Sequence, residues 1–110
     1  MPIFIYRGRY NADGLKGMMT SPEDREAALA KAFAGAGGKL LAFYLTFGED
    51  DFLTIADCPD NNAALALAIA GAAGGSISDM KTTIAVTAKE AMAAFKRAGE
   101  LSKTLKNAGR

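Results

Sequence analysis

Three consecutive carboxylates, Glu49, Asp50 and Asp51, lie between two apolar segments of the sequence. Adjacent side chains splay in different directions, and a Ca²⁺ loop needs about six oxygens at dedicated spacings that this run lacks. We therefore interpret the run as a solvated reversal between two strands, with metal binding and a role at the rim of a pocket as the alternatives. Asp51 can accept backbone N–H groups there, or pair with Arg7 or Lys81.

Cys58 is the only cysteine, and the sequence contains no histidine. The missing histidine removes the commonest general base near neutral pH and the commonest transition-metal ligand. Asp57 and Asp60 stand near the thiol in the sequence, and nearby carboxylates raise the pKa of a thiol. We predict that Cys58 is a small buried hydrophobe and not a nucleophile, and that the protein binds no metal ion and no cofactor.

Tyrosines and charged residues of the apolar segments form the remaining candidate site. Tyr and Arg side chains can hold an oxyanion or a carbonyl group without histidine. An enzyme is therefore one alternative: a cofactor-independent isomerase or monooxygenase for a small acidic or quinone-like substrate, using Tyr6 or Tyr44 with Arg7. The favoured interpretation is that the tyrosines pack in an interface and the cations stay solvated. The candidate ligand-binding residues are Tyr6, Arg7, Tyr44, Asp51 and Lys81.

The length of 110 residues indicates one domain, which buries roughly 65% of the unfolded chain's surface without a metal or disulfide. The net charge is +1, with both signs interspersed through most of the chain, so we expect no nucleic-acid partner. The longest apolar run has about 13 residues, fewer than the about 20 of a membrane-spanning helix, so we expect no membrane partner. The lone cysteine, and the lack of a signal-peptide pattern in MPIFIYRGRY, lead us to expect a cytoplasmic protein.

Strand and helix signals alternate along the first third of the chain. The segment PIFIYR is rich in β-branched and aromatic residues and predicts a strand. Ser21 as N-cap, Pro22 at the first helical position and Gly37 as a stop then predict a helix over about 22–36. The intervening DGLKGMMTS is expected to be a loop or a short helical turn.

The rest of the chain predicts a hairpin, a helix, a strand and a further helix. KLLAFYLTF and DFLTIADC flank a short polar link in which Gly48 can take a positive φ, which predicts an antiparallel hairpin over 39–58. Asp60 is the expected N-cap of an Ala-rich helix, and SISDMKTTIAVT is the expected fourth strand. A capping box from Thr87 to Glu90 predicts a third, amphipathic helix. Its basic end contains Lys103, Lys106 and Arg110.

This order of elements predicts an α+β fold, the ferredoxin-like βαββαβ sandwich, with an extra C-terminal helix. We assign residues 1–87 to the ferredoxin-like domain. Residues 88–110 form a C-terminal amphipathic helix and basic tail, which belongs to the same domain or to its oligomer interface.

The second strand is apolar on both sides, although the chain's own helices cover one face of such a sheet. We expect Leu40, Ala42 and Tyr44 on one side and further bulky apolar residues on the other. An open apolar face of several hundred Å² is uncommon in monomers. We therefore predict a homo-oligomer, at its simplest a homodimer whose sheets pack face to face, with the C-terminal helix folding back over that face as the alternative. A cavity between sheet and helices would suit a small molecule.

The segment GGKLLAFYLTFGEDDFLTIADCPDNNAALALAIA resembles the core of the GYD-domain family. The resemblance covers a Gly-Gly pair before an aromatic-rich strand, a Gly-centred turn that ends in Asp, a third strand, and a Pro-Asp step into an Ala-rich helix. It extends over roughly residues 3–87. Gly48, Asp51, Pro59 and Asp60 match the family pattern, whereas Asp50 stands where the family usually has Tyr.

The resemblance implies a ferredoxin-like fold near the dimeric α/β barrel proteins, and it carries no assigned reaction. From residues and resemblance together, we predict a homo-oligomeric module that binds a small molecule or another protein. Whether it is an enzyme is left open by the sequence.

Overall fold

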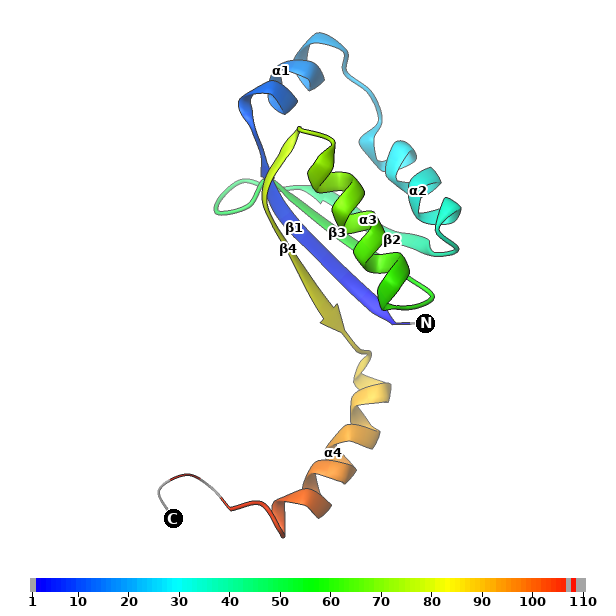
Figure 1. Ribbon diagram of the computed structural model, residues 1–110, viewed down its shortest axis with the longest axis vertical. Helices are drawn as coiled ribbons and strands as arrows, with labels where there is room; N and C mark the ends of the chain where they lie inside the picture. The colour runs from blue at the N-terminus through cyan, green and yellow to red at the C-terminus, as the bar shows by residue number, and fades with distance from the viewer. Residues whose placement is uncertain (1, 107, 109–110) are drawn as a thin grey trace.

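The computed structural model of the protein describes residues 2–106 and 108. Its four strands form one antiparallel sheet in the order β2-β3-β1-β4, and helices α2 and α3 lie on the same face of it (Figure 1). This arrangement confirms the predicted ferredoxin-like α+β fold with an extra C-terminal helix. The elements are β1 (Ile3–Tyr10), α1 (Ala12–Thr20), α2 (Arg25–Gly35), β2 (Lys39–Leu45), β3 (Phe52–Asp57), α3 (Asn61–Ala73), β4 (Ile77–Ala85) and α4 (Ala88–Ser102).

Helix α1 is the first departure from the sequence prediction, because Ala12–Thr20 forms a nine-residue helix where a loop or a short helical turn was expected. Asn11 caps this helix: its side-chain oxygen accepts the backbone N–H of Gly14 at 2.8 Å. Its side-chain nitrogen also donates to the carbonyl of Gly75, so the cap ties α1 to the segment before β4. The sequence prediction missed α1 because its two internal glycines weaken the helical pattern.

Helix α2 begins at Arg25, three residues later than predicted. The predicted N-cap, Ser21, instead ends α1, and Asp24 caps α2 by accepting the N–H of Ala27 at 3.2 Å. Ser and Asp are comparable N-caps, so the choice between them depends on where α1 ends and not on the cap itself.

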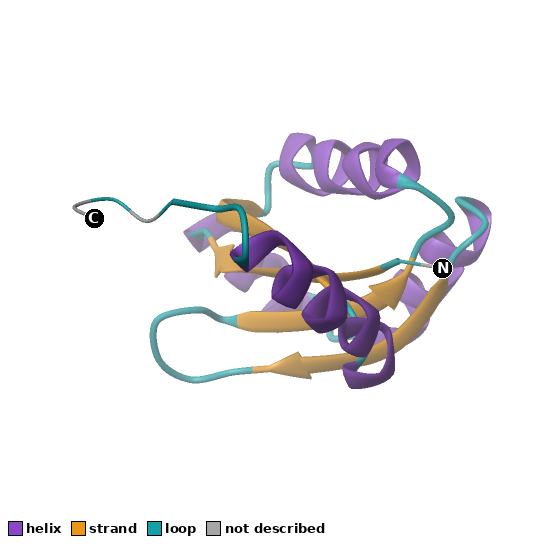
Figure 2. Cartoon of the chain, turned by 90° about the horizontal axis from the view of Figure 1, so that it is seen from below, coloured by secondary structure: helices purple, strands orange, loops and turns teal. Residues whose placement is uncertain are grey.

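The predicted hairpin is confirmed, because β2 and β3 pair antiparallel on either side of the polar link. Its register shifts between Leu40 and Ala42, where β2 has a β-bulge. The bulge corrects one expectation: Leu40 does not share a side with Ala42 and Tyr44, but packs against the core under the helices together with Phe43. Figure 2 shows the link between β2 and β3 as a loop that extends away from the sheet.

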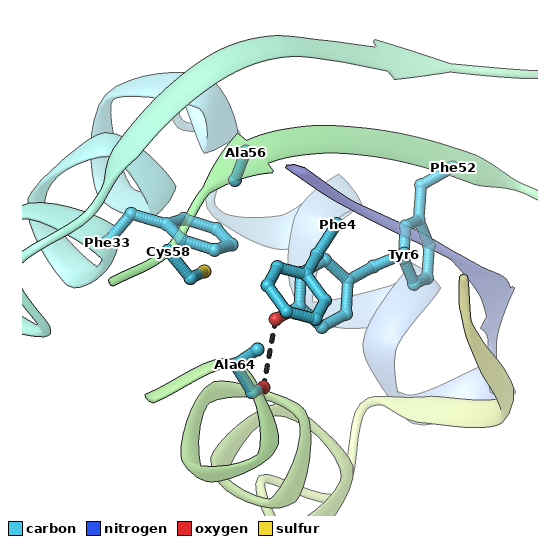
Figure 3. Packing of buried hydrophobic residues seen from close by; sticks show 7 residues of the cluster. All are labelled: Phe4, Tyr6, Phe33, Phe52, Ala56, Cys58 and Ala64. Atoms are coloured by element: carbon cyan, nitrogen blue, oxygen red, sulfur yellow. Dashed lines mark hydrogen bonds between the residues drawn. The ribbon is translucent and has the colours of Figure 1, made fainter. Parts of the chain in front are cut away.

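The core lies between the sheet and helices α2 and α3. Phe4 and Tyr6 of β1 meet Phe33 of α2 there, and the rings of Tyr6 and Phe33 are 5.8 Å apart at an angle of 57° (Figure 3). The other buried members are Phe52, Ala56, Cys58 and Ala64. Buried and less buried side chains alternate along β1 and β3, so every second residue points to the opposite face of the sheet, here called the open face. No helix of the described residues covers the open face (Figure 1).

Helix ends follow the predicted signals elsewhere. Gly37 follows α2 with a φ of +82°, a left-handed conformation that glycine adopts without strain. Asp60 caps α3 by accepting the N–H of Ala63 at 2.8 Å, and Thr87 and Glu90 form the predicted capping box of α4. Of the predicted basic end, Arg110 lies outside the described residues.

Candidate functional site

A cavity of about 260 Å³ lies between the sheet, α2 and α3. Its walls are mostly aliphatic and aromatic, and they come from both helices and from all four strands. The principal wall residues are Leu29, Phe33, Phe43, Phe52, Leu67, Ile77 and Met80. An apolar cavity in this place is the kind of site that binds small organic molecules.

Small residues on the two helices leave this space open. Ala32 of α2 and Ala70 and Gly71 of α3 line the cavity, where longer side chains would fill it. A β-carbon added at Gly71 would lie 3.7 Å from Met80 and 3.9 Å from Ile77, in ordinary van der Waals contact. The volume therefore depends on the small side chains of α2 and α3.

Thr54 of β3 adds a polar group to the apolar wall. The residue is 3% exposed and lines the cavity. No buried side-chain nitrogen or oxygen within the described residues lacks a hydrogen-bond partner, so Thr54 offers a ligand a polar contact and is not an unsatisfied group.

Tyr6 contributes a second hydroxyl, which is already engaged. It donates to the carbonyl oxygen of Ala64 in α3 at 2.9 Å (Figure 3). Burial raises the pKa of Tyr6 well above its ordinary value, and Cys58 nearby raises it further. Tyr6 is thus a neutral hydroxyl that ties β1 to α3 at any physiological pH, and it is poorly suited to donate or remove protons.

The mouth of the cavity is polar. Tyr10 and Arg25 line both the cavity and an adjoining hollow of about 270 Å³ under α1. Burial raises the pKa of Tyr10, while the nearby guanidinium of Arg25 lowers it in part. Arg25 is also paired with Glu23, and Asp13 lines the same hollow. The mouth therefore has donors from Tyr10 and Arg25 but no excess positive charge.

The GEDD carboxylates hold the loop in place. Asp51 accepts the backbone N–H of Tyr10 at 3.0 Å, one of the two roles predicted for it. The ion pair with Lys81 forms at Asp50 and not at Asp51, with Nζ 2.8 Å from the Asp50 carboxylate. This pair raises the pKa of Lys81. At the family's usual Tyr position, this chain thus has a carboxylate that binds the loop to β4.

The five candidate residues do not come together in one chain. Tyr6 lines the cavity. Arg7, Tyr44 and Lys81 lie on the open face, on the other side of the sheet, and Tyr44 is 61% exposed. Asp51 lies beyond the end of the cavity, in the β2–β3 loop. Neither Tyr6 nor Tyr44 shares an enclosed pocket with Arg7, so the geometry does not favour the enzyme alternative.

Residues that the sequence did not single out complete the site, namely Thr54, Arg25 and the small residues of the helices. Thr54 alternates with Phe52 and Ala56 along β3, so its position under the helices was readable from the strand pattern. The sequence did not indicate Arg25, because the predicted helix began at residue 22 and α1, which forms the adjoining hollow, was not predicted.

Cys58 is fully buried at the end of β3, beside Phe33 (Figure 3). Burial raises the pKa of its thiol, partly offset by the nearby hydroxyl of Tyr6, and Asp57 and Asp60 raise it further. The prediction that Cys58 is buried is confirmed, and a raised pKa disfavours the reactive thiolate. Within residues 2–106 and 108, no three acidic or cysteine side chains gather as a metal site would require.

Comparison with known proteins places the chain by family. A comparison with curated proteins finds no match. The family model of the GYD domain matches residues 4–95, which cover the sheet from the second residue of β1, helices α1 to α3 and the first half of α4. The match thus extends beyond residue 87, where the sequence resemblance ended. The chain belongs to the GYD domain family.

Proposed function

We propose that this protein is a homodimeric module that binds a small, mostly apolar molecule in the cavity between the sheet, α2 and α3. The observation that carries the proposal is the mostly apolar cavity of about 260 Å³, with Thr54 as a polar residue in its wall. A cavity of about 150 Å³ lined by aliphatic side chains accommodates benzene. The larger volume here suits a single ring with substituents.

The polar groups of the site favour an uncharged ligand with a carbonyl or hydroxyl group. Thr54 and Tyr10 can donate to such an oxygen, and Arg25 lies at the mouth. A carboxylate would have to compete with Glu23 for Arg25 beside the further negative charge of Asp13. Desolvating a charged group without a free partner is costly.

The homodimer is supported by the composition of the open face. Ile5 of β1 pairs with Ile55 of β3 there, Ile3 and Leu53 lie diagonally beside this pair, and Tyr44 extends the apolar area on β2. No helix covers this surface within the described chain. A two-fold axis that packs two open faces together would bury it without any new sequence.

Thermal denaturation with a panel of neutral single-ring compounds tests the binding proposal. A ligand at 100 times its Kd is expected to stabilise the protein by about 2.7 kcal/mol, an increase in Tm of roughly 10 °C. Gly71→Leu should fill the cavity and abolish the increase. Gly35→Leu is the matched control, because Gly35 lies on α2 outside the cavity with no atom near its side-chain position. A panel without effect, or equal binding by Gly71→Leu, would contradict the proposal.

Sedimentation equilibrium tests the dimer separately. Tyr44→Asp places a charge on the open face and should make the protein monomeric. Leu65→Asp alters a similarly exposed apolar residue on the outer side of α3, 58% exposed against 61%, and should leave the dimer intact. A monomeric wild-type protein at 100 µM, roughly the upper range of a weak specific dimer, would refute the dimer.

The cytoplasm remains our proposal for the compartment, because the single cysteine is free and buried. No helix among the described residues is long and apolar enough to cross a membrane.

A further inference from the structure

Helix α4 stands apart from its own chain. It leaves the end of β4 and continues away from the sheet along the long axis of the molecule, which measures 59 Å (Figure 1). It makes no extensive contact with another element of the described residues, and none of its described residues is buried. Phe95 is 75% exposed, and Met92 and Leu101 are 61% exposed.

The sequence nevertheless specifies this helix strongly. Thr87 and Glu90 form a complete capping box at its start. Ala91, Ala94, Phe95, Ala98 and Leu101 form an apolar stripe at helical spacing, whereas Ala93, Arg97 and Glu100 lie on the other side. An isolated helix of 15 residues is only marginally stable in water, and most helices gain their stability from packing an apolar side. Helix α4 therefore needs a surface that its own chain does not supply.

The charges of the chain identify a suitable surface. Residues 88–110 contain six basic and two acidic residues, a net charge of +4, whereas residues 1–87 contain seven basic and ten acidic residues, a net charge of −3. The overall charge of +1 conceals this division. The helix and tail of one copy are thus attracted to the body of another copy.

The start of α4 adjoins the open face. Ala85, the last residue of β4, pairs with Ile3, and Ile3 and Ile5 belong to the apolar half of that face. A second copy seated on the open face would therefore lie next to the start of α4. An interface formed by the two sheets continues directly into the apolar side of the helix.

The open faces of two copies are too small to account by themselves for the area that a specific dimer buries. Four strands about 4.8 Å apart, each with about six residues at 3.3 Å, cover roughly 400 Å² per sheet in plan, or roughly 800 Å² for two. Specific dimers bury about 1,200 to 2,000 Å² in total. A helix about 22 Å long on each copy can supply the difference.

We infer that α4 is an exchanged arm, whose apolar stripe through Phe95 and Leu101 packs on the second copy that covers the open face. The inference rests on the proposed homodimer and adds the contact that secures it. Each subunit holds its partner with its own α4, and the helix becomes stable only in the dimer.

Full-length variants measured by sedimentation equilibrium test the arm. Phe95→Glu should weaken the dimer about 10- to 100-fold, since it replaces a buried aromatic side chain by a charge. Ala93→Glu introduces the same charge on the opposite side of α4 and should leave the dissociation constant within about twofold. Because both residues are exposed in the single chain, both variants should retain the wild-type β-sheet circular dichroism.

A photo-crosslinker identifies the contact. Benzoylphenylalanine at position 95 is introduced into a ¹⁵N-labelled chain, which is mixed with unlabelled wild type. We expect an adduct between a labelled and an unlabelled chain. An adduct within one chain means that α4 folds back on its own body and overturns the inference. Wild-type dimerisation by Phe95→Glu, or Phe95-dependent binding of the chain to anionic vesicles with the dimer unchanged, also overturns it.

These results separate the arm from the proposed dimer. A dimer that tolerates Phe95→Glu but not Tyr44→Asp keeps the open-face interface and removes the arm. A wild-type chain that is monomeric removes both.

Discussion

The hydroxyl of Tyr6 offers the sharpest test of how the helices are fixed to the sheet. Tyr6→Phe removes one atom from the core. The ring stays, so its contact with Phe33 at 5.8 Å is retained, and the hydrogen bond of 2.9 Å to the carbonyl of Ala64 is lost. This bond joins β1 to α3 over 58 residues of sequence.

The expected cost follows from what remains. A buried neutral hydrogen bond contributes about 0.5–1.5 kcal/mol net. The Ala64 carbonyl keeps its acceptor role within the helical ladder of α3, so it is not left without a partner. We therefore expect Tyr6→Phe to lower the free energy of unfolding by about 1 kcal/mol, a decrease in Tm of roughly 4 °C.

Urea denaturation followed by circular dichroism measures this change, at one fixed protein concentration because dimerisation contributes to stability. Thr54→Val is the matched control. It also removes one hydroxyl from the same core, but it leaves the hydrogen bond between β1 and α3 intact. Its removal should leave the free energy of unfolding unchanged or raise it by up to about 1 kcal/mol.

The reasoning is refuted if Tyr6→Phe is as stable as the wild type. A loss in Thr54→Val equal to that in Tyr6→Phe would show that removing any core hydroxyl carries this cost and that the bond to Ala64 is not its source.

Three further outcomes are expected. In chemical denaturation, Gly14→Ala should lower the free energy of unfolding by about 2 kcal/mol or more, because the added β-carbon would lie 2.6 Å from the backbone oxygen of Ser76. Gly17→Ala on the same helix has no atom near the added β-carbon and should raise the free energy of unfolding by about 0.5–1 kcal/mol. Asp51→Ala should lower the free energy of unfolding by about 1–2 kcal/mol, because the N–H of Tyr10 loses its acceptor. Asp50→Ala breaks only the ion pair with Lys81 and should lower it by at most about 1 kcal/mol. Equal losses would contradict these different roles for the two carboxylates. The free energy of unfolding should fall as pH rises above about 10, because burial raises the pKa of Tyr6 and Tyr10 in the folded protein. Their contribution to stability is complete only below the pKa of an unfolded tyrosine and is lost as the pH rises above it. A free energy of unfolding that stays constant from about pH 8 to 11 would contradict this expectation.

The pattern of the sequence determined the layout of the sheet, the hairpin and the caps of α3 and α4. These features depend on neighbours in the chain, namely the alternation of β1 and β3, the φ open to glycine, and the side chains of Asp60 and Thr87. The placement of Cys58 in the core also followed from local chemistry. The family resemblance was visible for the same reason, because its signals lie in the turns and caps.

Tertiary structure alone decided which side chains meet. The bulge in β2 moved Leu40 to the helix-covered side, and a β-bulge depends on the partner strand. Tyr6 and Arg7 are adjacent in sequence but lie on opposite faces, whereas Thr54 and Arg25 reach one cavity from distant segments. The sequence determined which elements form, since propensity and capping act over a few residues. Only packing determined the site, because a cavity is the space that distant side chains leave unfilled.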